Sequence, residues 1–264
     1  LNMNKFEKLN KEFLRKGYLI QKVENKESLK YMNSLIKKKL SNLLKTNLSQ
    51  KKVSLDNLHK FIKPSELNSI RLKLINHLNS DEKFRKNYFE IAKSIIFSII
   101  GNELAMQNNI NLSIQMPKDQ SSLLPLHSDT WSGDSPFEVV VWLPMVNCYS
   151  TKSMFILKQN KSEKFRKYFS NKKLKISSQL DKKFKKDLVF LNIKFGQFLI
   201  FNQNLPHGNV VNSTNETRVS LNCRFKGLFT PYAQKKLGSF FSPLVVRPAS
   251  KIGLNYKFPG EEKE

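Results

Sequence analysis

Cysteine is scarce in this sequence, which excludes two common ways of stabilising a small domain. The only two, Cys148 and Cys223, lie in separate apolar segments and form no CxxC pattern. A disulfide framework needs several spaced cysteines, and a zinc ribbon needs paired ones. With 264 residues, 39% of them hydrophobic, the chain is long enough to bury a sizeable core instead. We therefore expect a globular protein of a reducing, cytoplasmic compartment.

Long apolar runs are also missing. The N-terminal segment LNMNKFEKLNKEFLRKG contains no apolar stretch typical of a signal peptide. The longest apolar run, SIIFSII (residues 94–100), is far shorter than the roughly 20 residues that cross a bilayer. We expect neither export nor a membrane span.

Acidic residues are outnumbered: 46 Lys and Arg stand against 21 Asp and Glu, for a formal charge of +25. Such a charge suits nucleic acid, an acidic membrane face or a phosphorylated substrate. The lysines, however, are scattered through nearly every segment among abundant Asn and Ile, as in a chain of biased overall composition. The charge by itself therefore does not favour nucleic acid as a partner.

The hydrophobic pattern changes near residue 105. Before it, a short strand is expected over residues 17–23, and apolar residues then recur at three- and four-residue spacing, as in helices. Four helices are expected there, with caps at Asn25, Ser54 and Ser65 and, for the last helix over residues 82–100, an end at Gly101. We interpret residues 1–105 as a mainly helical support.

After residue 105 the period changes to two. The expected strands are NINLSIQM (109–116), FEVVVWLPM (137–145), KSMFIL (152–157), LVFLNI (188–193), GQFLIF (196–201), HGNVV (207–211) and RVSLNCRF (218–225). Many short strands without interleaved helices predict an antiparallel barrel or jelly roll, giving a mainly β, α+β protein in one domain of residues 1–264. The core would occupy residues 106–230.

Two segments stay open to more than one interpretation. Residues 158–187 are crowded with lysine and form either a solvated helical insertion or a basic lid over an acidic substrate. Residues 231–264 form a C-terminal extension that wraps the barrel or pairs with another subunit. The oligomeric state does not follow from the sequence.

A candidate metal site begins in LPLHSDTW. In an extended segment, side chains two positions apart point the same way, so His127 and Asp129 can face one point. His207, at the start of a strand in the same half, offers a third ligand, whereas His59 and His77 lie in the helical half as ordinary helix residues. Two imidazoles and one carboxylate with open positions suit non-haem Fe(II) that activates oxygen. The alternative is a chance HxD pair beside a structural histidine.

The strand RVSLNCRF has one apolar and one hydrogen-bonding face. The polar face consists of Arg218, Ser220, Asn222 and Arg224. Such a face meets solvent or lines a cavity inside a barrel, where Arg218 offers a bidentate fork for a carboxylate. Lys152 is an alternative anchor for such a carboxylate.

At this point the chain resembles a known family. The pattern His127-x-Asp129, a distal His207 in an HG step, and Arg218-x-Ser220 eleven positions further resemble the Fe(II)/2-oxoglutarate-dependent oxygenases of the phytanoyl-CoA dioxygenase-like branch. FLRKGYLIQKV (13–23) resembles the opening strand of that branch. The block SSLLPLHSDTWSGDSPFEVVVWLPMVNCYSTKSMFIL (121–157) is similar to oxygenases found sporadically in bacterial carbohydrate-biosynthesis clusters.

The resemblance implies a double-stranded β-helix (a cupin-like jelly roll) in which His127, Asp129 and His207 hold Fe(II). The cosubstrate 2-oxoglutarate would chelate the metal, and its far carboxylate would meet Arg218, helped by Ser220. Oxygen would take the remaining position, with succinate and carbon dioxide as coproducts of a hydroxylation. Related halogenases have Ala or Gly where this chain has Asp129, so halogenation is disfavoured.

Further pocket residues are expected on the same resemblance. Gln115 is a candidate for hydrogen bonding the cosubstrate, with an exposed strand glutamine as the alternative. Trp142 is expected in the core. The substrate is expected to be a small molecule or a carbohydrate, either neutral or anionic. The candidates for contacting it are Trp131, Asp134, Asn222 and Arg224.

Two other functions compete with this one. Arg218 and Arg224 resemble the paired arginines of AlkB-like nucleic-acid demethylases, but Ser220 and Asn222 stand where that family has Asn and Thr, and no clustered aromatics for base stacking are found. The other is a non-catalytic jelly-roll protein that binds a sugar. It would not consume 2-oxoglutarate.

Overall fold

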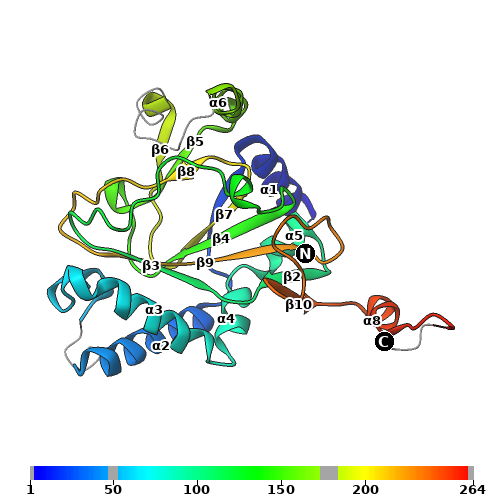
Figure 1. The fold of residues 1–264 in the computed structure, drawn as a ribbon, viewed down its shortest axis with the longest axis horizontal. Coiled ribbons are helices and arrows are strands. Elements are labelled where there is room, and N and C mark those ends of the chain that lie inside the picture. The colour runs from blue at the N-terminus through cyan, green and yellow to red at the C-terminus, as the bar shows by residue number, and fades with distance from the viewer. Residues whose placement is uncertain (1–2, 47–52, 173–183, 261–264) are drawn as a thin grey trace.

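The structure, a computed structural model, describes residues 3–46, 53–172 and 184–260. Two antiparallel sheets form its centre (Figure 1). The larger runs in the order β1-β7-β4-β9-β2-β10, with β3 paired to β9, and the smaller in the order β6-β5-β8. The strands are β1 (Tyr18–Lys22), β2 (Leu104–Gln107), β3 (Asn111–Gln115), β4 (Glu138–Pro144), β5 (Phe155–Leu157), β6 (Leu188–Phe190), β7 (Gln197–Asn202), β8 (His207–Gly208), β9 (Arg218–Gly227) and β10 (Phe241–Val245). The predicted α+β jelly roll is confirmed.

Most of the helices precede the jelly roll in the chain. They are α1 (Met3–Lys16), α2 (Lys26–Leu44), α3 (Leu67–Asn79), α4 (Phe84–Glu90), α5 (Lys93–Ile100), α6 (Gln159–Lys172) and α8 (Pro248–Asn255). Figure 1 shows α2, α3 and α4 on one side of the large sheet and α6 beside the small sheet. None of the described helices is long and apolar enough to cross a membrane.

Strand β9 has one face packed against the helices and one face toward the inside of the jelly roll. Its apolar residues are fully buried, and Phe225 stacks on Tyr88 of α4 with ring centroids 6.5 Å apart. The Tyr88 hydroxyl donates to the carbonyl of Val141 in β4 at 2.7 Å, so α4 is fixed to the sheet. The polar residues of β9 must then face the inside of the jelly roll, because successive side chains of a strand alternate.

The predicted helix over residues 82–100 is wrong in one respect, since the structure divides it into α4 and α5. The carboxylate of Glu24 accepts hydrogen bonds from the N–H groups of Ser94 (2.9 Å) and Ile95 (3.1 Å) in the first turn of α5. A cap from a distant residue thus starts a new helix where the hydrophobic pattern is continuous. The end at Gly101 is confirmed; its φ is +126°.

The helix caps predicted from serine are wrong as well. Ser54 precedes a short 3-10 helix, η1 (Leu55–Lys60), and makes no side-chain cap bond, while α3 begins two residues after Ser65. The Asn25 cap is confirmed, because its side chain accepts from the N–H of Ser28 at 3.0 Å.

The two open segments now have partial descriptions. The lysine-rich insertion forms α6 and a short 3-10 helix, η5 (Lys185–Asp187), and its residues 173–183 lie outside the described part of the chain. The extension after residue 231 contributes β10, which pairs with β2 and forms the last strand of the large sheet. Neither β2 nor β10 was among the strands expected from the sequence, and the expected strand 207–211 is reduced to β8.

Candidate metal centre and adjoining cavity

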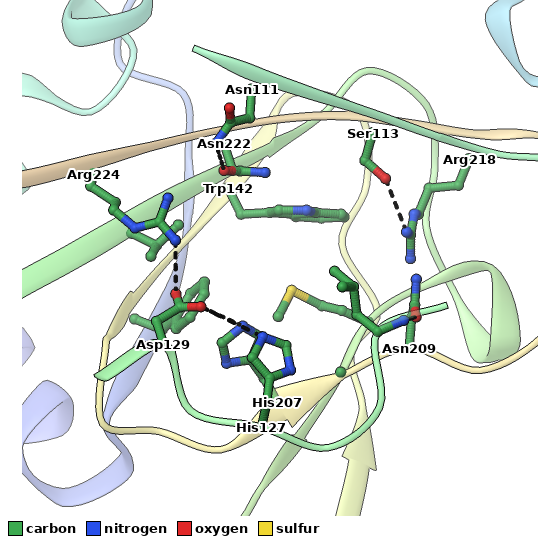
Figure 2. A pocket seen from close by; sticks show the side chains of 15 residues that line it. Asn111, Ser113, His127, Asp129, Trp142, His207, Asn209, Arg218, Asn222 and Arg224 are labelled. Atoms are coloured by element: carbon green, nitrogen blue, oxygen red, sulfur yellow. Dashed lines mark hydrogen bonds and ion pairs between the residues drawn. The ribbon is translucent and has the colours of Figure 1, made fainter. Parts of the chain in front are cut away.

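A cavity of about 290 Å³ lies between the two sheets (Figure 2). Its walls come from β3, β4, β7, β8 and β9 and from the segment before η3 (Asp129–Ser132). The lining residues are Asn111, Ser113, Leu124, His127, Asp129, Val140, Trp142, Met154, Phe201, His207, Gly208, Asn209, Arg218, Asn222 and Arg224. All three residues of the candidate metal site therefore open onto the same space.

Backbone pairing brings the two histidines together. His127 and His207 form an antiparallel bridge, in which each N–H donates to the other's carbonyl, at 2.9 and 2.8 Å. Their rings consequently lie side by side, with centroids 4.5 Å apart. Ser128 is extended and Asp129 starts η3, which turns the carboxylate toward the same rings.

The donor atoms converge on one point. Asp129 Oδ1 lies 3.5 Å from His127 Nε2 and 3.9 Å from His207 Nε2, and the three ligand atoms are all within 4.8 Å of one another. The Nδ1 atoms face backbone carbonyls, His127 that of Pro125 (2.7 Å) and His207 that of Leu205 (2.9 Å). An Nδ1–H donated to a carbonyl leaves the Nε2 lone pair toward the shared point. This group could hold a metal ion.

Electrostatics keep two of the three groups in the form that binds a metal. Burial lowers the pKa of His207 to about 4, so its imidazole is neutral near pH 7. Burial alone would raise the pKa of Asp129, but the His127 hydrogen bond and the nearby positive charges outweigh it and bring the pKa to about 2. For His127, burial lowers the pKa, and its hydrogen bonds to Asp129 and to the Pro125 carbonyl outweigh that effect and leave it above the ordinary value.

Arg224 steadies the outer oxygen of the Asp129 carboxylate. Its Nη2 lies 3.6 Å from Asp129 Oδ2, and its Nε forms a 2.9 Å ion pair with Asp134. Lys235 meets the other oxygen of Asp134 at 2.6 Å. Asp134 therefore lies behind Arg224 and does not line the cavity, and the structure places it as a support for the arginine.

Replacing Arg224 by glutamine is expected to weaken metal binding by about tenfold, the size of effect typical of groups that orient a ligand. Asp134 keeps Lys235 as a partner in this variant, so the fold should persist. Anaerobic titration with Fe(II) measures the change. Lys235→Gln is the matched control, because Lys235 contacts Asp134 without reaching Asp129; equal effects of the two substitutions would contradict this role.

Arg218 is a buried cation with few partners. Its side chain is 4% exposed, its Nη2 donates to Ser113 Oγ at 3.2 Å, and its Nε has no hydrogen-bond partner among the described residues. No carboxylate pairs with it in the part of the chain that the structure describes. Figure 2 shows it across the cavity from Asp129 and Arg224. A buried guanidinium is costly unless an anion meets it, so the cavity is suited to an anionic ligand.

Of the remaining candidate site residues, one lines the cavity and the others lie outside its lining. Asn222 lines the cavity and accepts from Asn111 Nδ2 at 3.1 Å. Ser220 and Gln115 are buried outside the lining. Ser220 Oγ has no hydrogen-bond partner in the described part of the chain, and Gln115 Nε2 donates to the Val210 carbonyl at 2.7 Å. Trp131 stacks on Phe165, with centroids 5.3 Å apart, beside a separate groove.

The structure also places Lys152, His59 and Trp142, which the sequence had singled out. Lys152 is fully buried and forms an ion pair with Glu216 at 2.6 Å, so it stabilises the loop before β9 and does not line the cavity. His59 lies in η1, and its Nδ1 is 2.9 Å from Thr217 Oγ1, next to Arg218. Trp142 belongs to the hydrophobic core, as expected, and also forms part of the cavity wall.

Sequence reasoning missed Asn111 and Ser113, which face the cavity from β3. The signal was present, since they occupy alternate positions of a strand whose pattern is polar and apolar in turn. Ser113 pairs with Ser220 in the β3–β9 register, which sets it beside the Arg218 guanidinium.

A carboxylate near the metal loop provides a pH test of this network. Burial, aided by the charge of Asp134, raises the pKa of Glu138 from 4.5 to about 7. The folded state thus favours protonated Glu138, and its contribution to stability is complete below about pH 4.5 and is lost as the pH rises through 7. Between about pH 5 and pH 8 the free energy of unfolding should fall by up to about 3 kcal/mol for this reason.

Glu138→Gln should remove this part of the pH dependence, as measured by urea unfolding across that range. The Ser135 N–H donates to one Glu138 oxygen at 2.9 Å, and Gln203 Nε2 donates to the other at 3.1 Å. The substitution suits the site once the Gln203 amide turns over, because its Oε1, which has no partner among the described residues, then accepts from the new amide. Identical pH profiles for the two proteins would show that Glu138 titrates normally.

The sequence matches no protein-family model and none of the curated proteins. Solved structures do match. The non-heme monooxygenase ThoJ, as a nickel complex, has a TM-score of 0.56 at 15% identity over 90% of this chain and 83% of ThoJ. EctD from S. alaskensis in its apoform has a TM-score of 0.52 at 13% identity, over 88% of this chain and 79% of EctD. HygX from Streptomyces hygroscopicus with iron bound has a TM-score of 0.50 at 12% identity, over 88% of this chain and 89% of HygX.

At these identities the likeness shows a shared fold. Fold and site together define a jelly-roll protein with a cluster of two histidines and one aspartate that could hold a metal ion. A particular chemistry does not follow from the fold, since one fold hosts many functions. It has to be argued from the cavity.

Proposed function

We propose that this chain is an Fe(II)- and 2-oxoglutarate-dependent oxygenase that hydroxylates a carbohydrate or a carbohydrate-linked intermediate. The observation that carries the proposal is the pairing, in one cavity, of the His-Asp-His cluster with a buried arginine that has no acidic partner among the described residues. The cluster suits a ferrous ion with open positions, and the arginine suits the far carboxylate of the cosubstrate.

The protein's own residues divide the work as follows. His127, Asp129 and His207 would hold the metal, and Arg218 would fix the cosubstrate by its distal carboxylate. Bound together, Fe(II) and 2-oxoglutarate activate oxygen and supply the oxidation, with succinate and carbon dioxide as coproducts. Asp129 occupies the position that a halide would need, so the product is expected to be free of halogen.

The walls of the cavity would keep water from the reaction. Val140, Met154, Phe201 and the ring of Trp142 give apolar surface to the cavity that the His-Asp-His cluster and Arg218 share. Exclusion of water strengthens the interaction of Arg218 with a carboxylate and limits side reactions. The substrate end is polar, where Asn111 and Asn222 meet at the rim.

Anaerobic spectroscopy tests the proposal. Fe(II) followed by 2-oxoglutarate is added to the purified apoprotein, and the visible charge-transfer absorption of chelated ferrous iron is recorded. We expect it to appear, to vanish in His207→Ala, and to persist in His77→Ala, a matched control with an exposed ring on α3. If neither iron nor 2-oxoglutarate binds, the oxygenase proposal is wrong and the sugar-binding alternative replaces it.

A further inference from the structure

A second, larger cavity of about 590 Å³ adjoins the first. It lies between α3, β3 and the segment 121–124, and four residues line both cavities: Asn111, Ser113, Leu124 and Asn222. The two spaces therefore meet at the rim formed by β3 and β9. A molecule in the second cavity would reach toward the metal cluster over this rim.

The wall of this second cavity combines neutral polar side chains with aliphatic ones. Its polar side consists of amides and hydroxyls: Asn68, Asn111, Ser113, Ser121, Ser122 and Asn222. Between them lie aliphatic side chains, among them Leu67, Ile75 and Leu123. Amides and hydroxyls both donate and accept, and aliphatic groups cover C–H faces, so the wall suits a polyhydroxylated molecule.

One charged side chain lines this cavity, and it is a cation. Arg71 projects from α3, is half-buried, and donates from Nη2 to Asn68 Oδ1 at 2.8 Å. It forms no ion pair within the described parts of the chain, and no acidic residue lines the cavity. In the first cavity the one acid, Asp129, already has Arg224 and the two histidines around it. Arg71 is thus a positive charge whose hydrogen bond goes to a neutral amide, with no acidic partner among the described residues.

We propose that the second cavity is the substrate site and that the substrate is a hydroxylated molecule carrying a carboxylate or a phosphate, which pairs with Arg71. The inference rests on the proposed oxygenase function and deepens it. Arg218 binds the cosubstrate in the first cavity, and Arg71 selects the substrate in the second. The helical region then does more than support the jelly roll, because α3 provides the selecting residue.

Paired sugar probes test the charge requirement. The anionic probes are D-glucuronate and D-glucose 6-phosphate, and their neutral counterparts are D-glucuronamide and D-glucose. Each is titrated calorimetrically into the full chain with Fe(II) and 2-oxoglutarate under anaerobic conditions. We expect at least one anionic probe to bind about tenfold more tightly than its neutral counterpart, as a charge-assisted hydrogen bond provides. The two anionic probes distinguish a carboxylate from a phosphate site.

Arg71→Gln should abolish this preference, whereas Lys73→Gln should leave it within about twofold, because exposed Lys73 on the same helix carries the same charge without lining the cavity. Thermal unfolding checks that both variants are folded. Equal binding of charged and neutral probes, no binding of either anionic probe, or an unchanged preference in Arg71→Gln overturns the inference.

The same titrations without Fe(II) and 2-oxoglutarate separate the two proposals. A preference for the anionic probe that depends on Arg71 supports the anion site even where the charge-transfer absorption fails to appear. An absorption that appears without any such preference supports the oxygenase and removes the substrate assignment.

Discussion

Replacing Asp129 by alanine is expected to lower turnover by about a thousandfold or more while leaving the protein folded. The expected loss exceeds the tenfold to hundredfold typical of residues that only orient a ligand, because Asp129 is the one carboxylate of the donor set. The fold should survive, since Asp129 lies at the cavity wall and its carboxylate faces His127, His207 and Arg224. Arg224 retains Asp134 as an ionic partner in the variant.

Succinate formation in the presence of substrate measures this effect, and thermal unfolding verifies the fold. Asp187→Ala is the matched control, because the Asp187 carboxylate lies on η5, outside the lining of the cavity. Turnover near the wild-type rate in Asp129→Ala would remove Asp129 from the site. Loss of the folded state would instead show that the carboxylate is structural.

The convergence of the candidate ligands could be predicted in part because the positions of His127 and Asp129 depend on short-range rules. Alternation in an extended segment sets His127 and Asp129 on one side, and β9 shows its polar face in the letters RVSLNCRF. The structure brings His127, Asp129 and His207 together through the bridge between His127 and His207. That bridge joins residues 80 positions apart. The sequence therefore indicated His207 as the third ligand through the family resemblance, and it did not predict the backbone pairing of His207 with His127.

What could not be predicted depends on tertiary contacts. The break between α4 and α5 follows from a cap supplied by Glu24, about 70 residues earlier, which no local pattern reveals. Asp134 was expected to contact the substrate, yet it forms an ion pair with Arg224 on the side away from the cavity. Its ionic partners Arg224 and Lys235 come from β9 and from the C-terminal extension, so only the folded chain defines its environment.

Arg218 illustrates a more general relation between site and stability. A cation with one neutral hydrogen-bond partner is held in a buried wall, where burial also lowers its pKa. Such a residue destabilises the ligand-free protein and contributes fully only when an anion arrives. Arg85 is the contrasting case, because it donates to the carbonyls of Met106 (2.8 Å) and Ser242 (3.3 Å) and joins β2 to β10.

Arg218→Met is therefore expected to change binding and stability in opposite directions. The affinity for 2-oxoglutarate should fall about a hundredfold, since a buried, charge-assisted pair is removed, while Fe(II) binding persists. The free energy of unfolding of the apoprotein should rise by about 1 to 2 kcal/mol, because an unpaired buried charge is replaced by an apolar side chain of similar length. Titration of the charge-transfer absorption measures the first change and urea unfolding the second.

The matched control is Arg85→Met, which should lower stability, since it removes the guanidinium that donates to the carbonyls of Met106, Gln107 and Ser242, and should keep the affinity for 2-oxoglutarate. A drop in stability for Arg218→Met with unchanged cosubstrate affinity would mean that the arginine serves the fold and not the ligand. A gain in stability together with the loss of affinity would identify Arg218 as a residue retained for binding at the expense of the fold, which is the expected behaviour of a functional group in a buried site.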